Sequence, residues 1–214
     1  MAFKLAQLAT SSRSGTEDRL AVHHLADGLV VLVADGAGGL SGGGAAADRV
    51  LAILERELGQ PGIEPFASAT WTQVLAEADL ELERDPACGE TTAVVVAVSA
   101  GGLAGASVGD SGAWLVHEDG HDDLTAGQHR KRRLGSGRAL PVPFERPALR
   151  GSLVVATDGL LAYARPADIG RLARGEDLDA AAQALVQLVC RLGSSWTTWR
   201  WCCSGPGDRS AGCP

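Results

Sequence analysis

The sequence predicts an α+β protein in which two antiparallel β-sheets form a central sandwich and helices flank it. Three observations predict this fold class. Short runs rich in Val, Leu and Ala are separated by glycine-containing turns, two helical segments interrupt these runs, and one longer helical segment follows the last of them. The chain of 214 residues has the length of a single domain.

The first strands form a hairpin. Strands are expected at 4–10, 19–25 and 28–34, with Ala26-Asp27-Gly28 as the turn between the last two. The run from Leu29 to Ala34 is apolar throughout, so we expect this strand to be buried on both faces.

Helices and strands then alternate in blocks. Helical spacing of apolar residues predicts a helix over 45–58, ended by Gly59, and a second over about 69–84, which stops before Pro86. Three further strands are expected at about 91–99, 102–109 and 112–117, joined by tight glycine turns.

The second half of the chain is less regular. Residues 121–150 are polar, basic and proline-containing, which is typical of a loop or flap. A buried strand is expected over 153–156. Short helices are expected to begin at Ala162, Arg165 and Asp177, the last extending to about residue 192.

Composition excludes several classes of protein. The net charge of −7 argues against a general nucleic-acid binder. No apolar stretch reaches the roughly 20 residues that span a bilayer, and the apolar run at the start is too short for a secretory signal. We therefore expect a cytoplasmic protein without membrane or nucleic-acid partners. The five cysteines show no CxxC pair, which argues against a zinc site.

Acidic residues recur at the edges of apolar runs. Glu17-Asp18, Asp35-Gly36 and Asp158-Gly159 occupy such positions, where loops collect charge beside a rigid scaffold. Carboxylates that converge there repel one another unless a hard divalent cation holds them together. A lone Asp-Gly usually marks a turn, and Glu17-Asp18 also fits a solvated pair. The ordered series instead favours metal-assisted hydrolysis with two ions.

These segments, in this order, resemble the metal-dependent Ser/Thr protein phosphatases of type 2C, the PPM family, in a compact bacterial form. The resemblance covers about residues 5–192. The matching segments are Arg13-x-x-x-Glu17-Asp18, Asp35-Gly36-x-Gly38-Gly39, Gly89-Glu90-Thr91-Thr92-Ala93, Val108-Gly109-Asp110-Ser111, Leu134-Gly135-Ser136-Gly137 and Ala156-Thr157-Asp158-Gly159-Leu160. It implies a sandwich with two Mn²⁺ or Mg²⁺ ions in the cleft between the sheets.

The resemblance also implies metal ligands. Asp35 would bridge both ions, and the carbonyl of Gly36 would bind one of them. Asp158 would bind the first ion. Glu17 would act at the second ion, directly or through water, and Asp18 would hold metal-bound waters. Glycine after Asp35 lets a backbone oxygen approach a cation closely.

Two further roles follow from the resemblance. Arg13 would pair with the substrate phosphate, for which a planar guanidinium is suited, and Asp110 would help to hold a further, weaker ion. Arg13 also fits an ordinary surface arginine, and Asp110 fits a turn cap. The implied reaction is attack on phosphoserine or phosphothreonine by a water between the two metals. The implied partners are phosphorylated proteins, and the activity would oppose a Ser/Thr kinase.

A basic run, His129-Arg130-Lys131-Arg132-Arg133, lies in the expected flap. No aromatic residues interleave, so we interpret it as solvated charge rather than as a nucleic-acid site. It can still attract phosphorylated substrates.

The end of the chain departs from the family. We expect a phosphatase-like domain over 1–194 and an aberrant tail over 195–214. The family's last strand carries one more Asp, whereas residues 195–203 contain no carboxylate. From Ser195 onward the chain has three of its five Trp and three of its five Cys, but no Val, Leu or Ile. We therefore expect the last strand to be missing and the tail to be disordered or frame-shifted.

The genetic code supports a shifted reading frame. When each codon is started at its third base, Trp196-Thr197 must give Asp, Trp201-Cys202 must give Val, and Cys202-Cys203 must give Leu. The intervening positions permit the family pattern Asp-Asp-Val-Ala-Val-Val-Leu. A naturally divergent tail is the alternative. The expected function is thus a phosphatase that is impaired in this chain, or a pseudophosphatase that binds partners without turnover.

Overall fold

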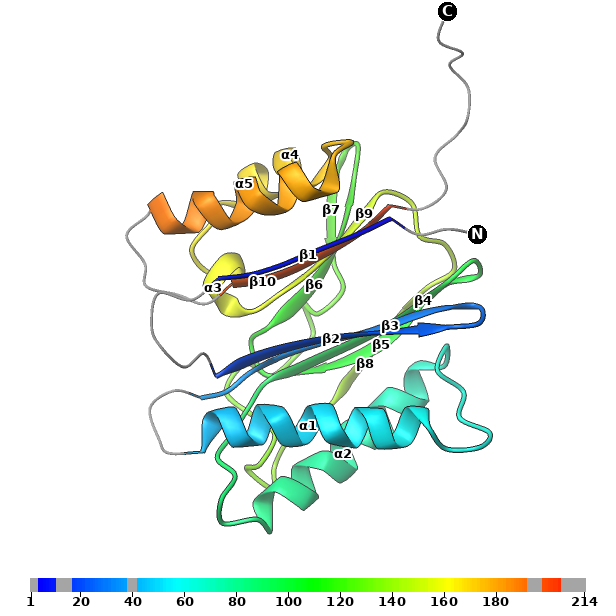
Figure 1. Cartoon of the computed structure of the whole chain (residues 1–214), viewed down its shortest axis with the longest axis vertical. Coiled ribbons are helices and arrows are strands. Elements are labelled where there is room, and N and C mark those ends of the chain that lie inside the picture. Colours follow the sequence, from blue (N-terminus) through cyan, green and yellow to red (C-terminus); the bar gives the residue numbers. More distant parts are fainter. Residues whose placement is uncertain (1–3, 11–16, 38–41, 192–197, 205–214) are drawn as a thin grey trace, which may run out of the picture.

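A computed structural model describes residues 4–10, 17–37, 42–191 and 198–204. These residues form four layers, in which two stacked antiparallel sheets lie between two layers of helices (Figure 1). The predicted fold class is therefore confirmed. Among the described residues, no helix is both long and apolar enough to cross a bilayer.

The first sheet, here called sheet I, has the order β2-β3-β4-β5-β8. Its strands are β2 (Asp18–Leu25), β3 (Gly28–Asp35), β4 (Ala93–Ser99), β5 (Gly102–Val108) and β8 (Val142–Arg146). Two helices, α1 (Gly43–Leu58) and α2 (Ser68–Glu83), cover its outer face.

The second sheet, sheet II, has the order β1-β10-β9-β6-β7. Its strands are β1 (Lys4–Thr10), β6 (Gly112–His117), β7 (Gly120–Asp123), β9 (Ser152–Ala156) and β10 (Thr198–Ser204). Its outer face is covered by α3 (Asp158–Leu161), α4 (Pro166–Ala173) and α5 (Leu178–Arg191).

Strand β3 shows how the sequence produces these layers. Val31 and Val33 pack into the core between the two sheets, whereas Val30 and Leu32 pack into the core beneath α1 and α2. Alternate side chains of a strand point to opposite faces, so a strand with apolar residues at every position needs a layer on each side. The prediction that this strand is buried on both faces is confirmed.

The flap prediction for residues 121–150 was wrong in part, because two short strands lie within or at the edge of this range. β7 and β8 each pair with a single neighbour at the outer edge of a sheet. An edge strand needs few apolar residues, and it tolerates Pro143 because one of its sides makes no ladder hydrogen bonds. The polar composition therefore concealed both strands.

The helix expected to begin at Ala162 was also misplaced. Residue 162 follows the end of α3, which begins at Asp158, one residue after the end of β9. An acidic residue in the first turn is favourable because it faces the positive end of the helix dipole. The helices expected from Arg165 and Asp177 are confirmed, since these residues immediately precede α4 and α5.

The prediction of a missing last strand was wrong. Residues 198–204 form β10, which lies between β1 and β9 and pairs antiparallel with both. Ladder hydrogen bonds join backbone groups, so a shifted reading frame does not remove them, and Trp, Thr and other residues of this segment favour extended backbone. The rest of the expected tail lies outside the described residues.

A proline substitution tests whether β10 is an interior strand. Cys202 pairs with Ala6 on one side and Val154 on the other. Cys202→Pro removes a ladder donor, whereas Cys202→Val keeps it. The lost hydrogen bond should cost about 2 kcal/mol or more, which lowers the melting temperature by at least about 4–8 °C in a domain of this size. The valine variant should melt within about 2 °C of the unaltered chain. Equal melting temperatures for the two variants would contradict the pairing.

Candidate functional site

Two carboxyl groups face each other at the open end of the β2–β3 hairpin. Asp18 is the first residue of β2, Asp35 is the last residue of β3, and the strand register places them opposite each other. Their side chains hydrogen-bond to each other, and Asp18 is only 5% exposed. The hairpin thus holds two acidic groups in direct contact in a region with little water.

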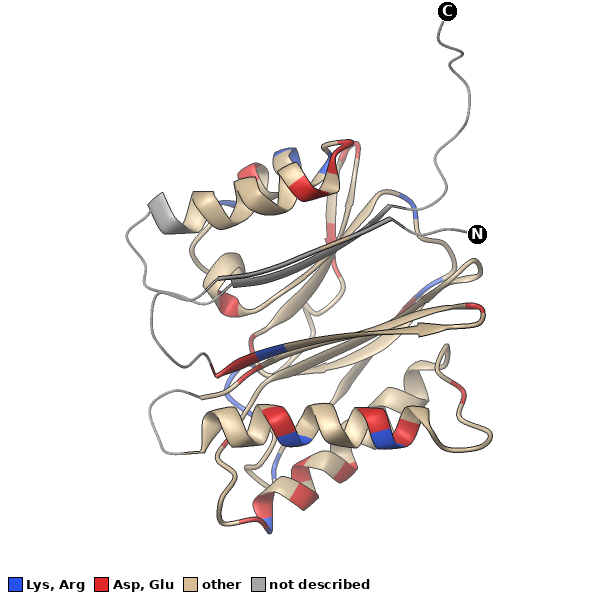
Figure 2. Ribbon diagram, in the orientation of Figure 1, with Lys and Arg blue, Asp and Glu red and all other residues tan. Residues whose placement is uncertain are grey.

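Sheet II contributes a third carboxyl group. Asp158 follows β9 after one intervening residue, its charge acts on Asp18, and the charge of Asp35 acts on it. The preceding residue, Thr157, is fully buried and donates a side-chain hydrogen bond to Asp18. Acidic residues at the start of β2 and at the start of α3 lie at the same end of the sandwich (Figure 2). The site is therefore built where the two sheets meet.

A hydroxyl network positions a fourth carboxyl group. The Asp35 backbone N–H donates to the Thr92 hydroxyl at 3.0 Å, and this hydroxyl lies 2.6 Å from that of Ser111. The adjoining turn needs Gly109, whose φ is +95° and whose missing side chain makes room for Thr92. The turn brings Asp110 close enough for its charge to act on Asp35 and Asp158.

Gly36 connects the site to the start of α1. Its N–H donates to the Glu17 carbonyl at 3.3 Å. A Cβ at this position would lie 2.4 Å from the Gly43 carbonyl carbon, so any larger residue would displace the helix. The glycine after Asp35 is therefore required by close backbone packing, in addition to any role toward a cation.

Arg133 supplies positive charge to the site, as Arg19 does beside Asp18. Its Nη2 donates to Oδ2 of Asp110 at 3.3 Å, and its charge favours the ionised forms of Asp35 and Asp158. The Nε atom of the same guanidinium is buried without a hydrogen-bond partner. One donor of this group is thus left without a partner among the described residues.

Burial dominates the ionisation of the three central groups. Loss of water raises the pKa of Asp35. The hydrogen bond that its protonated form donates to Asp18, and the charges of Asp18 and Asp110, raise this pKa further. Burial also raises the pKa of Asp18, and it raises the pKa of Asp158 to about 6, with the charge of Asp35 as the next cause. The raised pKa values mean that these carboxyl groups hold protons more tightly than free carboxyl groups do, because the nearby positive charges do not offset burial and mutual repulsion.

The donors of this site fit a hard divalent cation. Carboxylate oxygens are the ligands that Mg²⁺ and Mn²⁺ prefer, and a cation would relieve the repulsion among them. Within the described ranges, no group of three or more acidic, histidine or cysteine side chains already forms an assembled coordination shell. The structure therefore shows the donors gathered, with Asp18 and Asp35 hydrogen-bonded to each other.

Most predicted site residues come together. Asp18, Asp35, Asp110 and Asp158 converge, with Gly36 beside them. The Glu17 side chain instead packs toward Gly36 and Gly44 at the start of α1. Arg13 lies outside the described residues. The sequence analysis missed two contributors, Arg133 and Thr157. Arg133 lay within a run that was interpreted as solvent-exposed, and Thr157 lay in a matching segment but was given no role.

The comparison with solved structures decides the fold. No family model and no curated protein matches the sequence. A bacterial serine phosphatase superposes with a TM-score of 0.85 and 19% identity, covering 97% of this chain and 100% of that one. The chain has the type 2C phosphatase fold.

Other phosphatases of this fold agree. The Ser/Thr phosphatase Stp1 from Staphylococcus aureus matches with a TM-score of 0.84 and 19% identity over 97% of this chain and 96% of that one. The catalytic domain of the Ser/Thr protein phosphatase PstP, solved in complex with two manganese ions, matches with a TM-score of 0.76 and 20% identity over 94% and 97%. The type 2C phosphatase fold thus extends over nearly the whole chain.

The raised pKa of Asp35 predicts a pH-dependent stability. Between its ordinary pKa of 3.8 and its raised pKa of about 8, the folded chain holds more protons than the unfolded chain, so stability decreases as pH rises. In chelator, the melting temperature should fall between about pH 5 and about pH 8.5. The melting temperature of the Asp35→Asn variant should fall less over this pH range, because its side chain at position 35 does not ionise.

The size of this difference can be bounded. A tenfold change in proton affinity corresponds to about 1.4 kcal/mol, or about 3–6 °C in a domain of this size. We expect the two melting curves to separate by at least this amount on passing from low to high pH. Parallel pH profiles for Asp35→Asn and the unaltered chain would show that Asp35 ionises normally.

Proposed function

We propose that this chain is a metal-dependent protein phosphatase that hydrolyses phosphoserine and phosphothreonine, and that its activity is reduced by the sequence of β10. The main support is the convergence of four carboxyl groups from both sheets at one end of the sandwich. The chain shares its fold with Ser/Thr phosphatases. Its partners would be phosphorylated proteins, and it would oppose a Ser/Thr kinase.

The proposed ligands follow from the site. Asp35, the Gly36 carbonyl and Asp158 would hold two Mn²⁺ or Mg²⁺ ions, with Glu17 and Asp18 acting directly or through water. Asp110 would help to hold a weaker ion. The manganese-bound state of PstP supports this choice of metal. When bound, such ions acidify a water molecule and neutralise charge on the phosphoryl group.

The protein's own groups would orient the reactants. The Thr92–Ser111 network fixes the backbone of Asp35, and Thr157 fixes the carboxyl group of Asp18. These contacts leave the carboxylates little freedom, which is what a preorganised site requires. Arg13 is proposed to bind the substrate phosphate through its guanidinium.

The sequence of β10 motivates the proposed loss of activity. The antiparallel register pairs Trp201 with Val155, near the end of β9 that leads through Thr157 to Asp158. The start of β10 therefore lies at the carboxylate end of sheet II. None of residues 198–204 is Asp or Glu, so this strand brings no carboxylate to that end of the sheet. The shifted frame would place an Asp just before this strand, at the junction of Trp196 and Thr197.

Restoring the frame tests the proposal. The frame-restored protein should hydrolyse p-nitrophenyl phosphate in Mn²⁺ at least about tenfold faster than this chain, which is the smaller loss typical when the surroundings of a metal site change. Both proteins should be checked for folding by circular dichroism. Equal turnover would show that a carboxylate at the start of β10 is dispensable. Metal-independent turnover by both would contradict the proposed mechanism.

Asp35 should be essential in the frame-restored protein. Asp35→Asn removes the charge from the proposed bridging position, so less than about a tenth of the Mn²⁺-dependent activity should remain. Asp27→Asn is a matched control, because it makes the same chemical change in the exposed turn at the other end of the hairpin. The control should retain full activity. An active Asp35→Asn variant at saturating Mn²⁺ would remove Asp35 from the site.

The missing carboxylate also favours a second candidate, a pseudophosphatase that binds phosphorylated partners without turnover. The two candidates differ in one measurement on this chain. Binding of a phosphopeptide in Mn²⁺ without release of phosphate would support the pseudophosphatase, whereas release of phosphate would support the enzyme.

A further inference from the structure

The basic run Arg130-Lys131-Arg132 is the strongest concentration of positive charge in an otherwise acidic chain. All three side chains are exposed. None of them forms an ion pair with a residue in the described part of the chain, although eight other basic side chains do. The charge of this run is therefore available to a partner.

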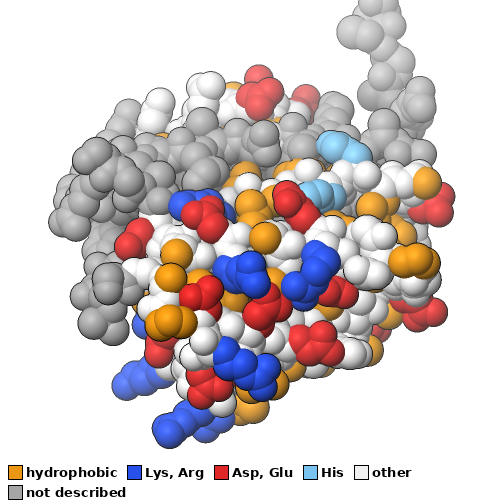
Figure 3. Space-filling model, turned by 60° about the horizontal axis from the view of Figure 1, so that its bottom comes forward, with side chains coloured by type: hydrophobic (Ala, Val, Ile, Leu, Met, Phe, Trp, Pro, Cys, Tyr) orange, Lys and Arg blue, Asp and Glu red, His pale blue; other side chains and the backbone are white. Residues whose placement is uncertain are grey.

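The outer surface that α1 and α2 form over sheet I has a different charge distribution. Acidic and basic side chains are interspersed on the face that α1 and α2 form (Figure 3). Arg49 and Arg56 each pair with Glu81, so their charges are partly neutralised within the protein. A surface of this kind has no net preference for an anionic partner, whereas the unpaired run has one.

The run is held next to the site by its neighbour in sequence. Arg133 lies directly after it and donates to Asp110. The following residue, Leu134, is fully buried and forms an isolated bridge with Thr91. The carboxyl-terminal end of the run is thus fixed at the edge of the carboxylate cluster.

A buried carboxylate secures the next turn. Asp79 of α2 is 4% exposed and accepts backbone N–H groups from Gly135 at 2.8 Å, Gly137 at 3.1 Å and Ala139 at 2.9 Å. Charge-assisted hydrogen bonds of this kind are strong and geometrically specific. The three basic residues therefore extend from a rigid base rather than from a free loop.

The position of the run beside the carboxylate cluster relates it to a peptide substrate. Arg130 and Lys131 lie in a turn, which the Arg132 N–H closes by donating to the His129 carbonyl at 3.0 Å, so the three side chains extend from one short segment of the surface. A peptide whose phosphoryl group lies at the carboxylate cluster would place residues a few positions away opposite the run. Carboxylate side chains at those positions would meet unpaired cations.

We infer that Arg130, Lys131 and Arg132 form a recognition surface for acidic residues that flank the phosphorylated residue of a protein substrate. This inference rests on the proposed function, because it takes the phosphoryl group to bind at the carboxylate cluster. Nucleic acid is the less favoured partner, since the run has no interleaved aromatic residue for base stacking and the whole chain carries a net charge of −7.

Peptide binding to the intact chain tests the inference. Two fluorescent peptides carry a hydrolysis-resistant phosphonate analogue of phosphothreonine, flanked by Glu in one and by Gln in the other. With Mn²⁺ at low salt, the Glu peptide should bind about tenfold more tightly in a fluorescence anisotropy titration, as three exposed ion pairs would give. This preference should weaken as salt is raised.

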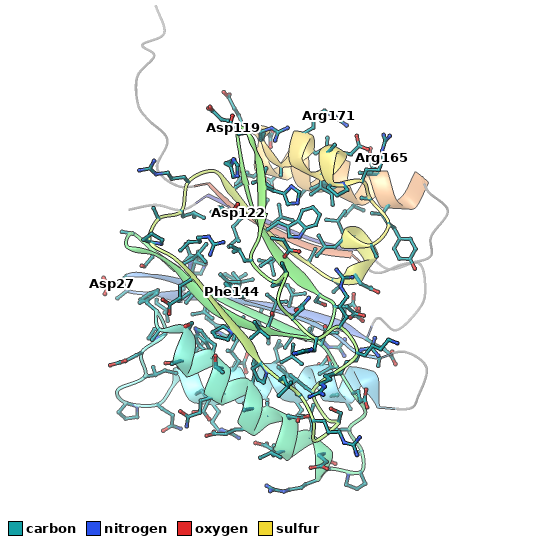
Figure 4. The ribbon with its side chains drawn as sticks, turned by 180° about the vertical axis from the view of Figure 1, so that it is seen from behind. Asp27, Asp119, Asp122, Phe144, Arg165 and Arg171 are labelled. Atoms are coloured by element: carbon teal, nitrogen blue, oxygen red, sulfur yellow. The ribbon has the colours of Figure 1, made fainter. Side chains whose placement is uncertain are left out.

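Two variants of equal charge separate the run from general electrostatics. Arg130→Gln/Lys131→Gln/Arg132→Gln should bind both peptides with equal affinity. Arg165→Gln/Arg171→Gln/Arg174→Gln removes the same charge around α4, where Figure 4 labels Arg165 and Arg171 on the outer side of sheet II, and should keep the preference. Circular dichroism checks that both variants fold.

Several results would overturn the inference. The first is that the unaltered chain binds the two peptides with equal affinity. The second is that the Arg130→Gln/Lys131→Gln/Arg132→Gln variant still prefers the Glu peptide. The third is that the unaltered chain binds a single-stranded oligonucleotide more tightly than either peptide and that the same variant loses this binding. Turnover of p-nitrophenyl phosphate tests the proposed function alone, because this compound has no flanking residues. A chain that does not hydrolyse it but prefers the Glu peptide would contradict the enzyme and support the recognition surface.

Discussion

The site depends on one unfavourable contact that the fold enforces, the burial of Asp18 against Asp35. The register of the β2–β3 hairpin leaves these groups no other position, and the packing of sheet II on sheet I removes the water that would separate their charges. The surrounding polar groups respond to this constraint. Thr157 donates to Asp18, and Arg133 opposes the negative charge from the other side.

Much of this arrangement was predictable from the sequence, because local pattern determines it. The apolar run of β3 and the Ala26-Asp27-Gly28 turn predicted a buried hairpin, and the structure has it. Asp35 and Asp158 were found because one ends an apolar strand and the other lies just beyond one, where loops collect charged side chains. In contrast, β7 and β8 are short edge strands whose identity comes from a neighbour, which periodicity cannot reveal.

The errors share a physical origin. Arg133 was grouped with its basic neighbours, since nothing in the run marks one residue as facing inward, and only the Asp110 contact separates it from them. The last strand was dismissed because its side chains fit no family pattern. Its place in the sheet is set by backbone groups of β1 and β9, which accept any residue except proline. In β10 the backbone therefore determines the place of the strand in the sheet, whereas the side chains determine what it contributes to the site.

The position of β10 also affects how the protein forms during synthesis. β1 precedes the other described strands, and its described part pairs only with β10, so that Lys4 meets Ser204, which is distant in the sequence. Sheet I can assemble on the nascent chain, but sheet II must wait until β10 has been synthesised. Closing such a long loop is slow, and β1 and β9 expose unpaired edges to other nascent chains in the meantime.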